Sequence, residues 1–216
     1  MSITKKIILF VVGLILVAGI LIVTGQLVSA IPINNGSENH WPSFEMTYKV
    51  ESLGENGGFY SQVVRLVYEN EHQWKTELLA HDLASDMVGY WAEYNGKEMI
   101  AYDPRIGSLS KNTDVPTDGV YVPDQWLRPN YIPGLIGQEG VVVQSGPIEG
   151  VNNLVLTEYS PCPDIPSLVP CKPGSNRILE TRIEYRSTDF IPLSIINMVD
   201  GTVVRRISIT TLVVQG

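Results

Sequence analysis

Short segments in which apolar and polar residues alternate, separated by tight turns, constrain the fold of this chain more than any other feature of its sequence. In the first segment Phe44, Met46, Tyr48 and Val50 alternate with charged or hydroxyl residues, so an extended strand would have one apolar and one polar side. Comparable segments recur as far as residue 214. The pattern predicts β-strands and leaves little room for helices.

Turn-forming residues divide the alternating part of the chain. The Gly-rich residues 54–58 and the dipeptides Asn95-Gly96 and Asp200-Gly201 have the composition of hairpin turns. Between 112 and 140, four prolines and four glycines exclude a long helix, and we predict one short helix near residues 124–127. Strands are predicted at residues 44–50, 60–68, 72–79, 87–94, 97–102, 106–111, 141–144, 153–160, 177–186, 191–198 and 202–214. The chain is therefore predicted to be mainly β, with about ten or eleven strands in a large, mainly meandering antiparallel sheet that curls around a core.

An apolar run at residues 7–31 follows Lys5 and Lys6. As a helix it would be about 38 Å long, which is enough to cross a bilayer. An uncleaved transmembrane anchor is one interpretation, and a signal peptide cleaved near Ala30 is the other. We favour the anchor because the apolar core is longer than that of a usual signal peptide. The two lysines predict a cytoplasmic N-terminus and a single-pass protein of the cell membrane; cleavage would instead give a secreted protein.

These features divide the chain into three parts. Residues 1–31 are the membrane anchor or signal segment, residues 32–43 are a polar tether, and residues 44–216 are one extracytoplasmic β domain of ordinary size. Apart from the two lysines, the chain has 13 basic and 23 acidic residues, a net charge of −10. Such a charge disfavours nucleic acid as a partner, and it equally disfavours binding to anionic lipid through a basic patch.

The only cysteines, Cys162 and Cys171, lie in a proline-rich segment of the predicted extracytoplasmic part. Thiols in an oxidising compartment form disulfides, and we predict that this pair forms one that acts as a local staple. A zinc site is the alternative, but two thiols without a second pair or a nearby histidine are a weak metal signal.

No catalytic motif is readable in the sequence, which contains neither a nucleophile elbow nor a zinc-protease, P-loop or dinucleotide-binding motif. His81 and Asp82 with Asp86 could form part of a cation site or a base with its orienting group. Ordinary polar side chains of a connection explain them better. We predict a non-catalytic protein with no catalytic residues, no metal site and no cofactor.

Four stretches together carry a family resemblance. They are Phe-Glu-Met-Thr-Tyr at 44–48, Trp-Lys-Thr-Glu at 74–77, Tyr-Asn-Gly-Lys-Glu-Met-Ile-Ala-Tyr-Asp-Pro at 94–104, and Ile-Pro-Leu-Ser-Ile at 191–195 ahead of Asp200-Gly201. With these stretches the chain resembles the LolA-like outer-membrane lipoprotein carrier superfamily and related sensor domains. The resemblance implies an unclosed antiparallel half-barrel whose concave face is covered by helices and holds acyl chains, without catalysis. Where such domains have a helix before the first strand, this chain has its proline-containing tether.

Aromatic residues fall on successive predicted strands, where alternation could bring several of them onto the concave face. Packing within an ordinary core is the alternative. We predict a domain that binds a lipid, an acyl chain or another amphipathic ligand, or else a structural or sensory envelope module that binds a protein and has no ligand cavity. The partners would be the membrane through residues 7–31, a lipid or lipoprotein ligand, and an envelope protein. The predicted ligand-binding residues are Tyr48, Tyr60, Leu66, Tyr68, Trp74, Tyr90 and Tyr102.

Overall fold

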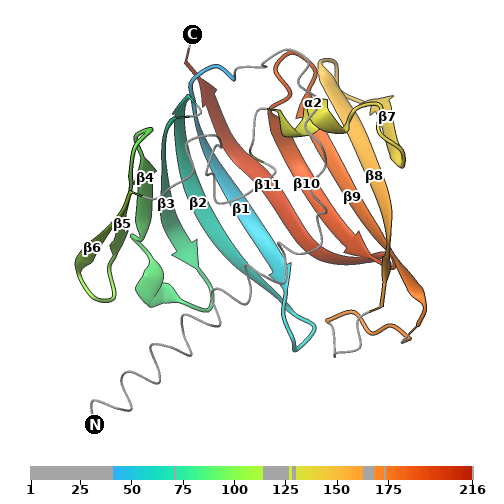
Figure 1. The fold of residues 1–216 in the computed structure, drawn as a ribbon, viewed down its shortest axis with the longest axis horizontal. Helices are drawn as coiled ribbons and strands as arrows, with labels where there is room; N and C mark the ends of the chain where they lie inside the picture. Colours follow the sequence, from blue (N-terminus) through green and yellow to red (C-terminus); the bar gives the residue numbers. More distant parts are fainter. Residues whose placement is uncertain are drawn as a thin grey trace. The chain divides into compact units, whose positions relative to one another are not determined.

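A computed structural model describes residues 41–70, 72–113, 127, 130–162, 168–172 and 174–215. These residues form one antiparallel sheet of eleven strands in the order β6-β5-β4-β3-β2-β1-β11-β10-β9-β8-β7, with β6 and β7 as its open edges (Figure 1). The mainly β fold and the unclosed antiparallel sheet predicted from the sequence are confirmed. The apolar run 7–31 and most of the tether lie outside the described residues. Among the residues that are described, no helix is long and apolar enough to span a membrane.

Two meanders make up the sheet. The first six strands are β1 (Phe44–Leu53), β2 (Phe59–Asn70), β3 (Gln73–His81), β4 (Trp91–Tyr94), β5 (Met99–Asp103) and β6 (Ser108–Asn112). The last five are β7 (Val141–Ser145), β8 (Val151–Pro161), β9 (Asn176–Arg186), β10 (Pro192–Val199) and β11 (Thr202–Val214). Pairing of β1 with β11, with Phe44 opposite Val214 and Val50 opposite Ile207, joins the meanders in the middle of the sheet.

Turn chemistry explains the hairpins. Asp200 and Gly201 have φ angles of +50° and +78°, the conformation that a two-residue turn between twisted strands requires. The Asp200 carboxylate also accepts a hydrogen bond from the backbone N–H of Ile178 at 2.8 Å. The connection between β4 and β5 is longer, four residues from 95 to 98. Gly96 has a φ of +86° there, and the Asn95 side chain accepts the backbone N–H groups of Lys97 and Glu98.

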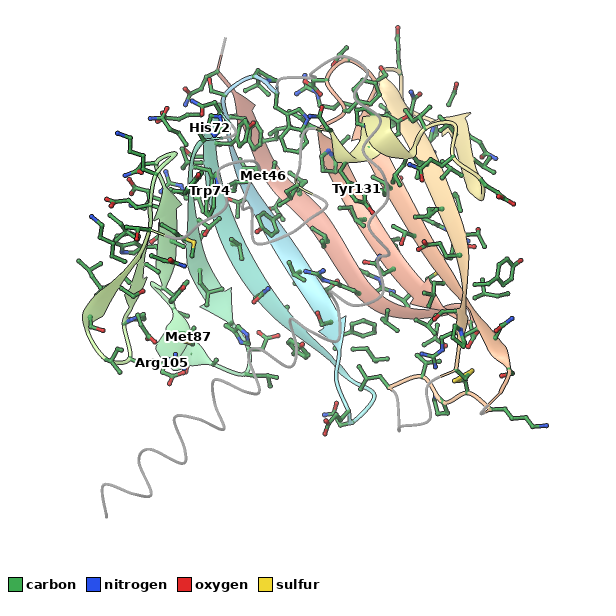
Figure 2. All side chains as sticks on the ribbon, viewed as in Figure 1. Met46, His72, Trp74, Met87, Arg105 and Tyr131 are labelled. Carbon is green, nitrogen blue, oxygen red and sulfur yellow. A yellow bond between two sulfur atoms is a disulfide. The ribbon has the colours of Figure 1, made fainter. Side chains whose placement is uncertain are left out.

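The β3–β4 connection differs from the prediction of a strand over 87–94. A 3₁₀ turn, η1 (Ser85–Met87), precedes Gly89, whose φ of +90° turns the chain before β4 begins at Trp91. The backbone N–H of Gly89 donates to the Leu78 carbonyl at 2.9 Å. Figure 2 labels Met87 and Arg105 toward the same end of the sheet.

A short helix, α2 (Tyr131–Leu135), is described C-terminal to the helix predicted near 124–127, whose first three residues lie outside the described part. It contains Pro133, a residue that the prediction treated only as a helix breaker. Proline is tolerated within the first turn of a helix, where its missing N–H has no intrahelical partner to lose.

Alternating burial defines two faces of the sheet. The inner face carries Phe44, Met46, Tyr48 and Val50 and the residues paired with them, and these four side chains are nearly inaccessible to solvent. The outer face carries ion pairs, among them Arg65 with Glu45 at 2.8 Å and Lys75 with Glu93 at 3.8 Å. The helix α2 crosses one face of β9 and β10 (Figure 1). Its buried side chains Ile132 and Leu135 identify that face as the inner one.

Candidate ligand-binding face

An aromatic row crosses the inner face from β1 to β4. It consists of Phe44, Tyr68, Trp74 and Tyr94, each directly opposite the next in the strand register. The rings of Phe44 and Tyr68 stack with centroids 5.0 Å apart, and those of Trp74 and Tyr94 lie 6.0 Å apart. Trp41 packs edge-on against Phe44 at 5.5 Å and Tyr68 at 5.7 Å. The ring contacts therefore form two groups, Trp41 with Phe44 and Tyr68, and Trp74 with Tyr94, and the register places Tyr68 opposite Trp74.

The neighbouring rows of the inner face are uncharged. Met46, Leu66, Thr76, Ala92 and Ala101 lie opposite one another from β1 to β5, so the side chains shorten toward the β6 edge. All five are buried. On the other half of the sheet, Ile207, Ile195, Ile183 and Leu154 continue the apolar surface across β11, β10, β9 and β8.

Five of the seven residues predicted to bind ligand lie on this inner face: Tyr48, Tyr60, Leu66, Tyr68 and Trp74. All of them except Tyr60 are buried. Tyr60 is half-buried and stacks on His81 with centroids 6.3 Å apart. Met46 and Trp74 lie near the same end of the sheet (Figure 2). Whether these residues contact a ligand remains a prediction.

Tyr102 lies on the outer face, so the prediction that it lines the concave face is wrong. It pairs with Trp91, and the two rings stack with centroids 6.2 Å apart. The Lys75 ammonium lies 4.6 Å from the centroid of the Trp91 ring. Because Ala92 and Ala101 take the inner positions of β4 and β5, their neighbours Trp91 and Tyr102 must point outward. The half-buried Tyr90 precedes β4, and its carbonyl accepts the N–H of Leu78 at 2.8 Å.

Three inner-face residues were absent from the predicted binding set. Trp41 was assigned to the tether, and Tyr94 was recognised only as one of the strand aromatics. Asn197 on β10 donates from Nδ2 to the Thr181 hydroxyl at 3.0 Å, while its Oδ1 is buried without a hydrogen-bond partner among the described residues. Alternation within β10 could have placed Asn197 on the same face as Ile195, but nothing in the sequence indicated that its Oδ1 atom would be buried.

The histidine and carboxylate cluster of the β3–β4 connection has a structural role. His81 Nδ1 accepts the backbone N–H groups of Leu83 and Ala84, each at 3.1 Å. The Asp82 carboxylate accepts the hydroxyl of Ser61 at 2.8 Å and its backbone N–H at 2.7 Å, and these bonds lower the pKa of Asp82. In the described part of the chain, no group of three or more histidine, cysteine or acidic side chains could hold a metal ion.

A depression of about 230 Å³ lies on the outer face, lined by Arg65, Val67, Lys75 and Glu77. Its charged groups already have partners on the sheet: Arg65 pairs with Glu45, Glu77 lies 3.9 Å from Arg65, and Lys75 pairs with Glu93. We regard the depression as a gap between surface ion pairs, because it lies on the face opposite the aromatic row.

Glu158 is expected to make the stability of the sheet depend on pH. It lies on β8 two residues after the buried Leu156, and desolvation raises its pKa. Because its ionised form is disfavoured in the folded state, stability should increase as the pH falls through this raised pKa. At neutral pH, Glu158→Gln is expected to raise the melting temperature by at most about 1 °C, because the side chain keeps part of its contact with solvent. Well below about pH 4 the difference should vanish, since the glutamate is then protonated in both states.

Calorimetry of both proteins from acidic to neutral pH measures this effect. Glu184→Gln, at an exposed outer-face position on β9, is the matched control and should leave the melting temperature unchanged. Equal effects of the two substitutions at neutral pH would show that burial of Glu158 is not the cause.

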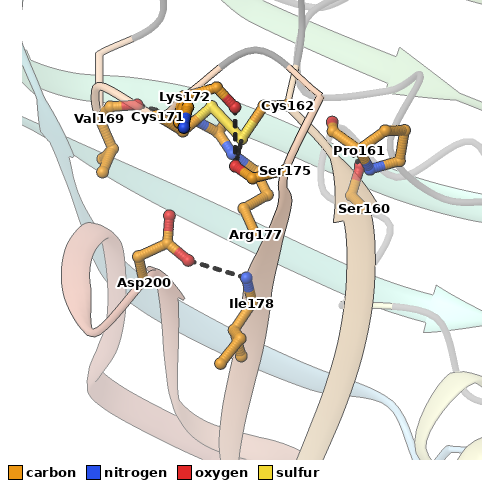
Figure 3. The surroundings of a disulfide bond; sticks show 10 residues. All are labelled: Ser160, Pro161, Cys162, Val169, Cys171, Lys172, Ser175, Arg177, Ile178 and Asp200. Carbon is orange, nitrogen blue, oxygen red and sulfur yellow. Dashed lines mark hydrogen bonds between the residues drawn. A yellow bond between two sulfur atoms is a disulfide. The ribbon is translucent and has the colours of Figure 1, made fainter.

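The predicted disulfide between Cys162 and Cys171 is confirmed, with the two Cα atoms 6.0 Å apart (Figure 3). Arg177, buried on β9, holds the loop that the disulfide closes. Its guanidinium donates to the Val169 carbonyl at 2.8 Å and lies 3.0 Å from the sulfur of Cys171. The loop is therefore attached to the sheet by a side chain as well as by its own ends.

Reduction of this disulfide is expected to loosen the loop and leave the sheet folded, at a cost of about 1–3 kcal/mol. The closed loop is short, and its prolines already restrict the unfolded chain, so the bond adds little constraint. Hydrogen exchange with and without reductant should show faster exchange in residues 168–172 only. The Cys162→Ala/Cys171→Ala variant should not respond to reductant. Loss of the strand signal in circular dichroism on reduction would contradict a local role.

These features define the class of protein as an open antiparallel sheet with an apolar, aromatic-rich inner face. No family model matches the chain, and no curated protein sequence matches it. Its fold is similar to that of an uncharacterised conserved protein from Thermus thermophilus (13% identity, 81% of this chain and 80% of that one, TM-score 0.44). It is also similar to a LolA superfamily protein from Nitrosomonas europaea (9% identity, 81% of this chain and 87% of that one, TM-score 0.38). A third similar fold is a chain of the Pseudomonas aeruginosa MucA/MucB complex (12% identity, 82% of this chain and 53% of that one, TM-score 0.41).

Proposed function

We propose that the chain is a membrane-anchored, extracytoplasmic and non-catalytic domain that binds a lipid, an acyl chain or another amphipathic ligand on its inner face. The observation that carries this proposal is the continuous uncharged surface formed by the aromatic row and the apolar rows beside it. Transferring an acyl chain from water to such a surface is favourable by about 0.8 kcal/mol for each buried methylene. No group on these rows is suited to acid–base or nucleophilic chemistry other than hydroxyls.

The inner face is covered, because Tyr48, Leu66 and Trp74 are at most 3% exposed. A ligand must therefore displace what covers them. The described cover includes the five-residue helix α2, which buries only Ile132 and Leu135. Such a short element can move without breaking the hydrogen bonds of the sheet.

The disulfide supports an extracytoplasmic location, since such bonds persist in oxidising compartments and are rare in the cytosol. The apolar run 7–31 behind Lys5 and Lys6 supports anchoring in the membrane, with the N-terminus on the cytoplasmic side. A lipid or lipoprotein on the exported side of that membrane is the ligand class that fits both features.

Lipid extraction and mass spectrometry of the full chain purified from membranes test the binding function. The expected result is a stoichiometric amphiphile that is lost when the inner face is made polar by Leu66→Asn, a variant whose folding circular dichroism must first establish. The outer-face variant Val67→Asn is the matched control. Recovery of the folded chain free of any amphiphile, together with failure of added amphiphiles to bind, would contradict the proposal.

A protein-interaction module is the second candidate, and the β7 edge favours it. Its residues, Val141 to Ser145, carry no charge, and Val142 and Val143 are 52% and 42% exposed. The other edge, β6, carries Lys111, which pairs with Glu98. Uncharged edges invite pairing with a further strand, which natural proteins usually discourage with charge. Photocrosslinking from position 144 of the same strand should capture an envelope protein, and Val142→Lys should abolish that capture without unfolding the sheet.

A further inference from the structure

Two polar atoms within the aromatic contacts are buried without a hydrogen-bond partner among the described residues. They are the hydroxyl of Tyr94, a side chain that is 1% exposed, and the indole Nε1 of Trp41, a side chain that is 4% exposed. Leaving such groups unpaired costs free energy on folding. Phe44, in the same row, packs equally well without a polar atom. Folding alone would therefore favour phenylalanine at position 94.

The chemistry of these two groups restricts what could pair with them. An indole N–H donates only, so the partner missing from Trp41 is an acceptor atom. A tyrosine hydroxyl can donate as well as accept, so an acceptor atom satisfies Tyr94 too. Met46, Leu66, Thr76 and Ala92, which form the adjacent row, are all uncharged. A carboxylate or phosphate would be buried there without a counter-charge, at high cost. A neutral oxygen meets both requirements.

We propose that the Tyr94 hydroxyl and the Trp41 indole bind neutral carbonyl oxygens of an acyl ester or amide whose hydrocarbon chain lies along the apolar rows. The inference rests on the proposed amphiphile-binding function and adds a preference for one class of ligand to it. Esters are preferred both to hydrocarbons, which satisfy neither donor, and to free fatty-acid anions, which bring an uncompensated charge. Beside Tyr94 the adjacent row continues with the small side chains of Ala92 and Ala101, whereas Met46 and Leu66 stand beside Phe44 and Tyr68.

The test uses the full chain in amphipol and three probes of similar length: methyl decanoate, decanoate and undecane. Each probe competes with aminoanthracene, whose fluorescence reports its displacement. The wild-type chain should bind methyl decanoate most tightly. Tyr94→Phe should weaken methyl decanoate binding about 3- to 10-fold, the value of one hydrogen bond, and leave undecane binding unchanged. Trp41→Phe should cause the same selective loss, and Tyr102→Phe, on the outer face, should cause none.

The melting temperature of the ligand-free variants distinguishes a ligand-binding hydroxyl from a structural one. Tyr94→Phe should melt at or above the wild-type temperature, because it removes an unpaired hydroxyl and leaves the ring in place. A fall in melting temperature with unchanged ester preference would assign the hydroxyl to a structural hydrogen bond or a buried water, and would overturn the inference. Equal binding of ester and undecane by the wild type would also overturn it while sparing the binding function. Failure of all three probes to bind would remove the binding function itself.

Discussion

Replacing Leu66 with alanine is expected to lower the free energy of unfolding by about 2–5 kcal/mol. Leu66 is fully buried at the centre of the inner face, directly opposite Met46 on β1 and Thr76 on β3. Its neighbours are held by the strand register and cannot close over the space that truncation leaves, so a cavity adds to the lost burial. Urea denaturation followed by circular dichroism measures the change. A domain of marginal stability could lose a large part of its folding free energy.

The adjacent residue provides the control for this substitution. Val67 follows Leu66 on β2 but lies on the outer face, opposite Glu45 and Lys75. Because it is only partly buried, Val67→Ala should cost less than about 1 kcal/mol. Equal costs for the two substitutions would mean that burial does not alternate along β2 and that the inner face has been assigned to the wrong residues.

Gly140→Ala is expected to cost about 3 kcal/mol or more, because the substitution meets two separate obstacles. The φ angle of Gly140 is +79°, which non-glycine residues rarely adopt, and an added Cβ would lie 2.5 Å from the carbonyl oxygen of Thr157. The Gly140 carbonyl also accepts the backbone N–H of Thr157 at 2.9 Å. This hydrogen bond connects the residue just before β7 to strand β8. Relief of the clash would pull β7 away from the sheet.

Gly150→Ala meets the conformational obstacle without the steric one. Gly150 has nearly the same φ, +78°, but an added Cβ would have no heavy atom within 4 Å among the described residues. In this variant the free energy of unfolding should fall only by the conformational cost of the positive φ angle, about 1 kcal/mol. Both variants are compared by urea denaturation, and hydrogen exchange should show loosening of β7 in the first alone. Similar costs would indicate that β7 and β8 are not packed at Gly140 as described.

Local structure was largely predictable because its causes are local. The turn at Asp200-Gly201 requires positive φ angles that those two residues tolerate, and the alternation from Phe44 to Val50 places its apolar side chains on one face whatever the neighbouring strand. The disulfide followed from two cysteines that are close in sequence. The start of β4 was missed because Met87, Val88 and Tyr90 resemble strand residues, whereas the positive φ of Gly89 turns the chain.

The candidate binding face was predictable only in part, because a period of two identifies two faces without saying which one is covered. Tyr102 and Tyr94 illustrate this limit. Both are tyrosines on short strands beside the Asn95-Gly96 turn, yet Tyr94 faces inward against Trp74 and Tyr102 faces outward against Trp91. The inward position of Ala92 and Ala101 settles the difference, and small residues give little indication of burial in a sequence.

The sequence by itself determined the strands, their turns, the local staple and the absence of catalytic motifs, since each depends on residues close together in the chain. Only the tertiary structure decided that β1 pairs with β11, that Trp41 packs on Phe44 and Tyr68, and that Tyr94 buries its hydroxyl unpaired among the described residues. These outcomes depend on contacts between distant segments, where backbone hydrogen bonds are alike for every strand. Side-chain packing across the whole inner face selects among the alternative strand orders, and no short stretch of sequence encodes that selection.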